Sequence, residues 1–168
     1  AGNRFEIKVR GVDSDCGPRA GAILDVLARR GVPNYFGPQR FGARGDNALI
    51  GKAVLQRNYE EAIALMLGRP GPMDHGDALR ARELFDKGDY AKAADAWPRG
   101  MFAQQSRMCR TLAKGGGKAR DAWRVVDHTL RKLFLSAFQS DLFNRVMALR
   151  LERGLFDRIE NGDVAYKH

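Results

Sequence analysis

The chain has 168 residues, 44% of them hydrophobic, which is enough for one domain with a real core or for one domain plus part of another. It carries 29 Lys and Arg against 20 Asp and Glu, and this formal charge of +9 favours a polyanionic partner, because phosphate contacts release counterions. With no run of 18 apolar residues, no signal-peptide pattern, and two cysteines (Cys16 and Cys109) too far apart for a metal-ligand motif, we expect a cytoplasmic protein with reduced thiols and no membrane segment.

The first predicted element is a β-strand. Phe5, Ile7 and Val9 alternate with charged residues, the period of a strand with one buried face. A strand needs a sheet, yet little further strand sequence follows. We therefore expect the sheet to lie mostly outside these 168 residues or to come from a second copy, with self-association through the unpaired strand edges.

A helix is predicted from about Arg19 to Arg30, with Gly31 as its stop. The segment 31–42 then has no helical or strand period, because Pro33 and Pro38 each fix φ and remove an amide donor. It is an unusual loop, since three aromatic residues are available for burial (Tyr35, Phe36 and Phe41).

Two interpretations of the loop 31–42 remain open from its residues. It is either a rigid, packed connection between elements or a ligand loop in which Gln39, Arg40 and the aromatic rings meet a phosphate or a splayed base. Arg40 itself lies between Gln39 and Phe41 in a glycine-bounded loop. We expect it to hold the shape of the loop rather than to contact phosphate.

The rest of the chain is predicted to be mostly helical. The segment 68–72 and the triple glycine 115–117 interrupt the pattern, the latter as a hinge and not as a phosphate loop. A turn is predicted at 161–163, followed by the start of a strand at 164–166. The expected helices run from a cap at Asp46 to Val54, from a cap at Asn58 to Leu67, and over 77–87, 89–97, 101–113, 119–135 and 136–153.

No self-contained catalytic constellation stands out from the residues alone. His75, His128 and His168 are scattered, with none in a ligand spacing, and the first two are expected on the surface. The serines have no flanking glycines of a nucleophile elbow. The residues therefore predict neither a metal site nor a hydrolytic triad.

Three collinear stretches nevertheless resemble one family, the TruD family of tRNA pseudouridine synthases. Gly31-Val-Pro-Asn-Tyr-Phe-Gly37 with Gln39-Arg-Phe-Gly42 resembles its signature loop. Gly2-Asn-Arg-Phe5 resembles the Gly-Asn-x-Phe of the strand before that loop. Leu135-Ser-Ala-Phe-Gln-Ser140 with Leu142-Phe-Asn144 resembles a helix after it, and Gly162-Asp163 a later turn.

The resemblance implies an RNA-modifying isomerase. The family converts a uridine of transfer RNA, usually uridine-13, to pseudouridine with an aspartate and with no cofactor or metal. Its mixed α/β catalytic domain carries a separate inserted domain. The implied class is α+β: residues 1–30 as a strand-helix piece of the catalytic domain, and residues 31–168 as a mostly helical TRUD insertion domain, incomplete at its C-terminus.

The resemblance also implies which residues form the site. Asn3 matches the substrate-contacting asparagine of the family, and Phe5 matches the aromatic beside it, near the flipped base. The signature loop is represented by Asn34, Tyr35, Phe36, Gly37, Gln39, Arg40, Phe41 and Gly42.

The catalytic aspartate of the family has no counterpart in these 168 residues. It belongs to a Gly-x-Lys-Asp motif upstream of the Gly-Asn-x-Phe strand, and this motif does not occur here. We therefore expect a fragment of a tRNA pseudouridine synthase that is inactive by itself. A stand-alone basic helical module that binds RNA or protein without chemistry is the alternative.

Overall fold

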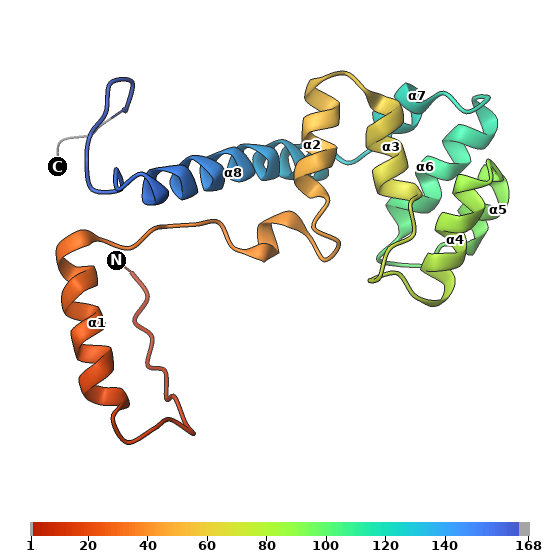
Figure 1. Cartoon of the computed structure of the whole chain (residues 1–168). Coiled ribbons are helices and arrows are strands. Elements are labelled where there is room, and N and C mark those ends of the chain that lie inside the picture. The colour runs from red at the N-terminus through yellow and green to blue at the C-terminus, as the bar shows by residue number, and fades with distance from the viewer. Residues whose placement is uncertain (1, 165–168) are drawn as a thin grey trace. The chain divides into compact units, whose positions relative to one another are not determined.

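The computed structural model describes residues 2–164 (Figure 1). These residues fall into two compact units, one made of residues 2–34 and 149–164 and the other of Tyr35–Ala148. Within residues 2–164 the chain forms helices and connecting segments, and no β-strand is present. The helices are α1 (Cys16–Arg30), the 3-10 helix η1 (Pro38–Phe41), α2 (Asn47–Leu55), α3 (Tyr59–Leu67), α4 (Gly76–Asp86), α5 (Tyr90–Ala96), α6 (Ala103–Lys114), α7 (Ala119–Arg124) and α8 (His128–Glu152).

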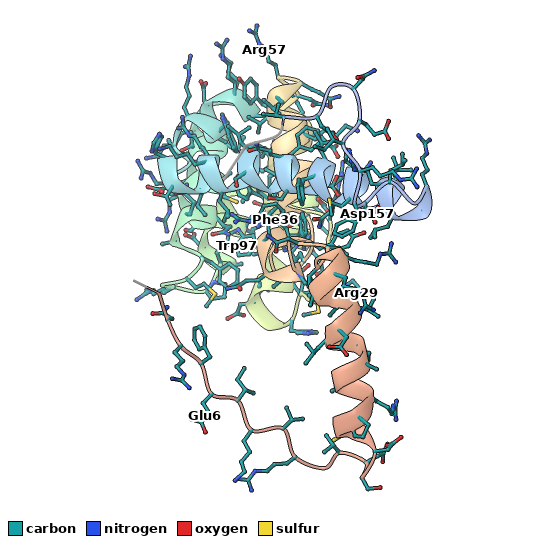
Figure 2. The ribbon with its side chains drawn as sticks, turned by 90° about the vertical axis from the view of Figure 1, so that its left-hand side faces the viewer. Glu6, Arg29, Phe36, Arg57, Trp97 and Asp157 are labelled. Atoms are coloured by element: carbon teal, nitrogen blue, oxygen red, sulfur yellow. The ribbon has the colours of Figure 1, made fainter. Side chains whose placement is uncertain are left out.

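The hydrophobic core belongs to the unit Tyr35–Ala148, where α2 to α7 gather into one cluster (Figure 1). Its largest fully buried side chains are aliphatic or sulfur-containing and come from α3 and α6: Ile63, Leu67, Met108, Leu112 and Cys109. Figure 2 shows Trp97 inside this cluster, and its ring stacks on Phe102 with 5.2 Å between centroids. Burial raises the pKa of the Cys109 thiol to about 11, so this free cysteine stays protonated at neutral pH.

A glycine lets two helices touch at the edge of this core. A Cβ atom on Gly51 of α2 would lie 2.1 Å from the carbonyl oxygen of Phe134 in α8. The two backbones are therefore in direct contact, which no larger residue allows. This crossing sets the position of α8 against the cluster, and α8 carries half of the site described below.

Local capping signals explain several helix starts. The Asn58 side chain accepts a hydrogen bond from the Glu61 amide at 3.1 Å, and Asp89 does the same for Lys92 at 3.3 Å. Gly31, with φ +80°, ends α1 as expected. The predicted Asp46 cap is wrong in its chemistry, because this carboxylate instead accepts from Arg44 Nε at 2.8 Å.

The predicted continuous helix over 119–135 is also wrong. The helix is interrupted at residues 125–127, between α7 and α8, and α8 then continues without interruption to Glu152. Gln104 of α6 holds the break: its Nε2 donates to the Val125 carbonyl at 2.9 Å, and its Oε1 accepts from the Asp127 amide at 3.2 Å. The Asp127 side chain then caps α8 by accepting from the Thr129 amide at 2.8 Å.

The unit of residues 2–34 and 149–164 has far less packing. None of the residues of α1 is buried. Arg150 ties the C-terminal segment together by pairing with Asp163 at 2.8 Å and donating to the Leu155 carbonyl at 3.1 Å. Gly162, with φ +100°, forms the expected turn. Of the strand start predicted at 164–166, residues 165 and 166 lie outside the described part of the chain.

The predicted Phe5–Val9 strand is not formed in the described residues. The side chains of Phe5, Ile7 and Val9 are 78%, 81% and 70% exposed, and the segment has no ladder partner. The physical reason is that a strand is stabilised only by pairing, which the other described residues do not provide. The helical part of the expected α+β class is confirmed, and the β part is not seen here.

Candidate functional site

The loop 35–42 is fastened to α8 by one side-chain amide. The Phe36 amide donates to Asn144 Oδ1 at 2.9 Å, and Asn144 Nδ2 donates to the Phe36 carbonyl at 2.9 Å. Both backbone groups of Phe36 are therefore satisfied by one residue that is 108 positions away in the sequence. Figure 2 shows Phe36 beside α8. This double hydrogen bond joins two of the stretches that resemble the same family.

The Phe36 ring is the centre of a small side-chain group. Its edge meets Phe143 at a centroid distance of 5.5 Å and an interplanar angle of 79°. The guanidinium carbon of Arg40 lies 5.2 Å from the centroid of the same ring. Arg40 Nη1 also donates to Ser136 Oγ at 3.4 Å, a long hydrogen bond. These contacts agree with the expectation that Arg40 holds the shape of the loop.

The second half of the loop is one turn of 3-10 helix. Pro38 begins it, and the Arg40 amide donates to the Gly37 carbonyl at 3.0 Å. It ends at Gly42, whose φ is +81° and whose added Cβ would lie 2.9 Å from Asn47 Nδ2. The positive φ favours glycine here, and a Cβ would in addition push the Asn47 side chain aside. The prediction of a loop without helical structure is thus corrected for Pro38–Phe41, since a 3-10 turn tolerates proline at its first position.

An open pocket of about 450 Å³ lies on this surface. It is lined by Phe36, Gly37, Gln39, Arg40 and Leu133. These residues supply an aromatic face, a neutral amide, a guanidinium and an apolar wall. Such a set can stack on a planar base or hydrogen-bond to a phosphate or a base edge.

The other predicted site residues are divided between the two units. Asn3 and Phe5 belong to the unit of residues 2–34 and 149–164 and are exposed there, and Asn34 belongs to the same unit. Of the three aromatics available for burial, Tyr35 and Phe36 are 42% and 38% exposed, and Phe41 is half-buried. An exposed ring on a fastened loop is available to a ligand.

Sequence reasoning missed the charged cluster that holds the neighbouring segment 68–74. Asp74 is buried and pairs with both Arg44 and Arg82, with Arg82 Nε at 2.8 Å from Asp74 Oδ1. Arg82 also donates to the carbonyls of Met66 and Gly68 at 3.0 and 2.9 Å. Desolvation lowers the pKa of Arg82, although the Asp74 carboxylate opposes this shift. In the sequence this region is marked by the Gly/Pro-rich segment 68–72, which predicts a loop and gives no indication of a buried ion pair.

The remaining expectations concern two surface histidines, a metal site and a membrane-spanning helix. His75 and His128 are exposed, as expected. In residues 2–164 no group of three or more His, Cys, Asp or Glu side chains is arranged to hold a metal ion. Within the same residues, no helix has the length and apolar character needed to cross a membrane.

Comparisons with known proteins agree with the resemblance of the three stretches. The family model described as tRNA pseudouridine synthase D (TruD) matches residues 1–168. The chain is 42% identical over 167 residues to the tRNA pseudouridine synthase D of Geotalea daltonii and 44% identical over 169 residues to that of Geobacter metallireducens; these alignments cover 99% and 100% of this chain. They cover 41% of each relative, so the chain spans about two fifths of the length of these curated relatives.

A solved structure is similar over most of the chain. It is a crystal structure of a protein assigned as tRNA pseudouridine synthase D (TruD) from Methanosarcina mazei. The TM-score is 0.71 at 29% sequence identity, with 82% of this chain and 33% of that chain covered.

Proposed function

Since the chain belongs to the tRNA pseudouridine synthase D (TruD) family, we propose that it is part of an isomerase that converts a uridine of transfer RNA, uridine-13, to pseudouridine. The whole reaction needs residues beyond those printed here, because the Gly-x-Lys-Asp motif expected to carry the catalytic aspartate is not among these 168 residues. In this proposal the chain supplies part of the substrate wall and the helical region that holds the RNA, in the cytoplasm and without a cofactor.

One observation carries the proposal. The loop 35–42 and the helical stretch 135–144, which resemble the same family separately, contact each other through Phe36 and Asn144. Two unrelated patterns that happened to match would have no reason to meet. The paired amide bonds and the Phe36–Phe143 contact give these residues a common structural task, which is to fix a loop whose rings stay exposed.

The candidate site residues divide into two proposed roles. Asn3 and Phe5 contact the flipped uridine, as the matching residues of the family imply. The loop residues Phe36, Gln39 and Arg40 line the open pocket and border the path of the RNA. Arg40 acts there as a positioning residue, because its guanidinium is already engaged by Phe36 and Ser136.

For the domain arrangement, we propose that residues 1–30 belong to the catalytic domain and residues 31–168 to the TRUD insertion domain, giving an α+β protein. The alternating residues of Phe5–Val9, exposed here, support a strand that joins a sheet of the catalytic domain. Pairing between copies of the isolated chain is the competing outcome. Light scattering over a concentration series distinguishes the two, since a strict monomer excludes pairing between copies.

A chimera tests the proposed function. This chain replaces the corresponding segment of the Geotalea daltonii relative, to which it is 42% identical. Pseudouridine formation is then assayed on unmodified transfer RNA beside the unaltered relative and the isolated 168-residue chain. We expect the chimera to form pseudouridine and the isolated chain to form none. A folded chimera without activity contradicts the proposal, and turnover by the isolated chain contradicts our account of the missing aspartate.

A further inference from the structure

The excess positive charge of the chain is concentrated in one segment. Residues 99–132 hold nine Lys and Arg against two Asp, a formal charge of +7, whereas residues 68–98 hold five Lys and Arg against six Asp and Glu. Most of the net +9 of the chain therefore lies on α6, α7, the turn between them and the start of α8. Helix α5 packs against α6, and α4 packs against α5, within the same unit.

Helix α6 displays this charge along one exposed face. Arg107, Arg110 and Lys114 are spaced i, i+3 and i+7, which places them on one side of the helix, and all three are exposed. The opposite side is buried in the core through Met108 and Leu112. The helix contains no acidic residue that could neutralise the exposed face.

Neither the helix dipole nor salt bridges within the protein explain why these cations lie on the exposed face of α6. Lys114 in the last turn is favourable for the helix dipole, but Arg107 lies between the first and last turns, where the dipole contributes little. Arg110 makes an ion pair with Asp95 at 3.7 Å, with side-chain exposures of 60% and 82%, so water screens it strongly. Among residues 2–164, Arg107 and Lys114 make no salt bridge.

An open pocket of about 550 Å³ adjoins one end of this face. Arg99 and Arg110 line it together with Trp97, Ser106 and Asp95. Two guanidinium groups beside an open, partly polar hollow can hold a phosphate and the ribose next to it. Arg99 precedes α6 and is exposed, so it extends the row of cations on α6.

We propose that the exposed cations of α6 (Arg107, Arg110 and Lys114), together with Arg99, bind the sugar–phosphate backbone of the transfer RNA at a place separate from the loop 35–42. The inference rests on the proposed function for the identity of the polyanion. A backbone contact suits this surface because it presents cations at helical spacing and few groups that could read a base. The surface would hold the body of the RNA while another region acts on the uridine.

Salt-dependent binding of unmodified transfer RNA to the 168-residue chain tests the inference. The test variant carries Arg107→Gln, Arg110→Gln and Lys114→Gln. The matched control carries Lys52→Gln, Arg80→Gln and Lys87→Gln, which removes the same charge from exposed positions on α2 and α4 and at the end of α4. Thermal melts of both variants verify that they fold.

We expect the slope of log K against log salt to fall by about two units in the α6 variant, because each lost phosphate contact removes about 0.7 to 0.9. The control should change the slope by less than about half a unit. Equal effects of the two variants, or equal competition by polyglutamate and transfer RNA, overturn the inference. Absence of binding by the unaltered chain overturns it too, while the chimera still reports separately on the proposed function.

Discussion

Two loops of the unit Tyr35–Ala148 are held in opposite ways. The loop 35–42 is fastened at its surface by two neutral hydrogen bonds between Phe36 and Asn144 and by contacts around the Phe36 ring. The segment 68–74 is fastened from inside by Asp74, whose carboxylate accepts from Arg44, Arg82 and the Gly71 amide. The side chains of Asp74 and Arg82 are only 6% and 5% exposed.

The difference separates a loop held by buried charges from a loop held by hydrogen bonds at the surface. Breaking a buried ion pair leaves an uncompensated charge in the interior, so the segment 68–74 is coupled to the folding of the whole cluster. Breaking surface hydrogen bonds exposes the groups to water, which replaces them. The loop 35–42 can therefore change without loss of the core, which suits the binding role proposed for it.

The largest effect is expected when the buried charge loses its partner. Asp74→Ala leaves Arg82 without its carboxylate and frees Arg44 and the Gly71 amide, so we expect a loss of about 3–5 kcal/mol of unfolding free energy. Urea denaturation measures it. Asp77→Ala, on the exposed start of α4, is the matched control and should change stability little. A loss below about 1 kcal/mol for Asp74→Ala would remove the contrast between the two loops.

A smaller effect is expected at the surface-held loop. Asn144→Ala removes both hydrogen bonds to Phe36, and we expect a loss of about 1–2 kcal/mol, since each is worth about 0.5–1.5 kcal/mol. The Phe36 amide should exchange with solvent much faster, while amides of α3 and α6 keep their protection. Gln139→Ala, an exposed change on the same helix, serves as the control. Faster exchange throughout α3 would show that the loop is coupled to the core after all.

Arg40→Lys should have a smaller effect still. Lysine keeps the charge but loses the planar guanidinium that lies over Phe36 and reaches Ser136, so we expect a loss of about 0.5–1 kcal/mol. The salt slope of transfer RNA binding should stay unchanged. The control is Arg145→Lys, an exposed arginine paired with Asp141 on α8. If the slope falls by about one unit with no loss of stability, Arg40 is a phosphate contact and not a positioning residue.

The smallest effect on stability is expected when the pH is lowered. The hydrogen bond from the Thr129 amide holds the pKa of Asp127 below its usual range, so its stabilisation of α8 is present at neutral pH and is lost as the pH falls through the lowered pKa of the folded state. Asp127→Asn keeps an acceptor for the amide but does not titrate. The drop in melting temperature between pH 7 and pH 3 should therefore be smaller in the variant, by about 1–3 °C. An equal drop in both proteins would contradict this role of Asp127.

Local chemistry in the sequence predicted much of the helical framework and the family. Asn58 followed by Glu61, Gly31 after a basic turn, and the Gly/Pro break at 68–72 each act within a few residues of the chain, so their outcomes could be read without a fold. The signature loop and its two collinear supports likewise indicated the family that the comparisons show.

Only the tertiary structure decided how these pieces are used. The break between α7 and α8 depends on Gln104, more than 20 residues away. Arg44, which binds the Asp46 carboxylate in place of a cap, is itself held by Asp74, 30 positions along the chain. Phe36 contacts Asn144 across 108 positions. The segment Phe5–Val9 has strand periodicity but no partner among the described residues. The physical reason is the same in each case. A side chain or strand with several possible partners pairs with the one that packing brings within hydrogen-bond distance. The periodicity of the sequence does not show which distant residues come that close.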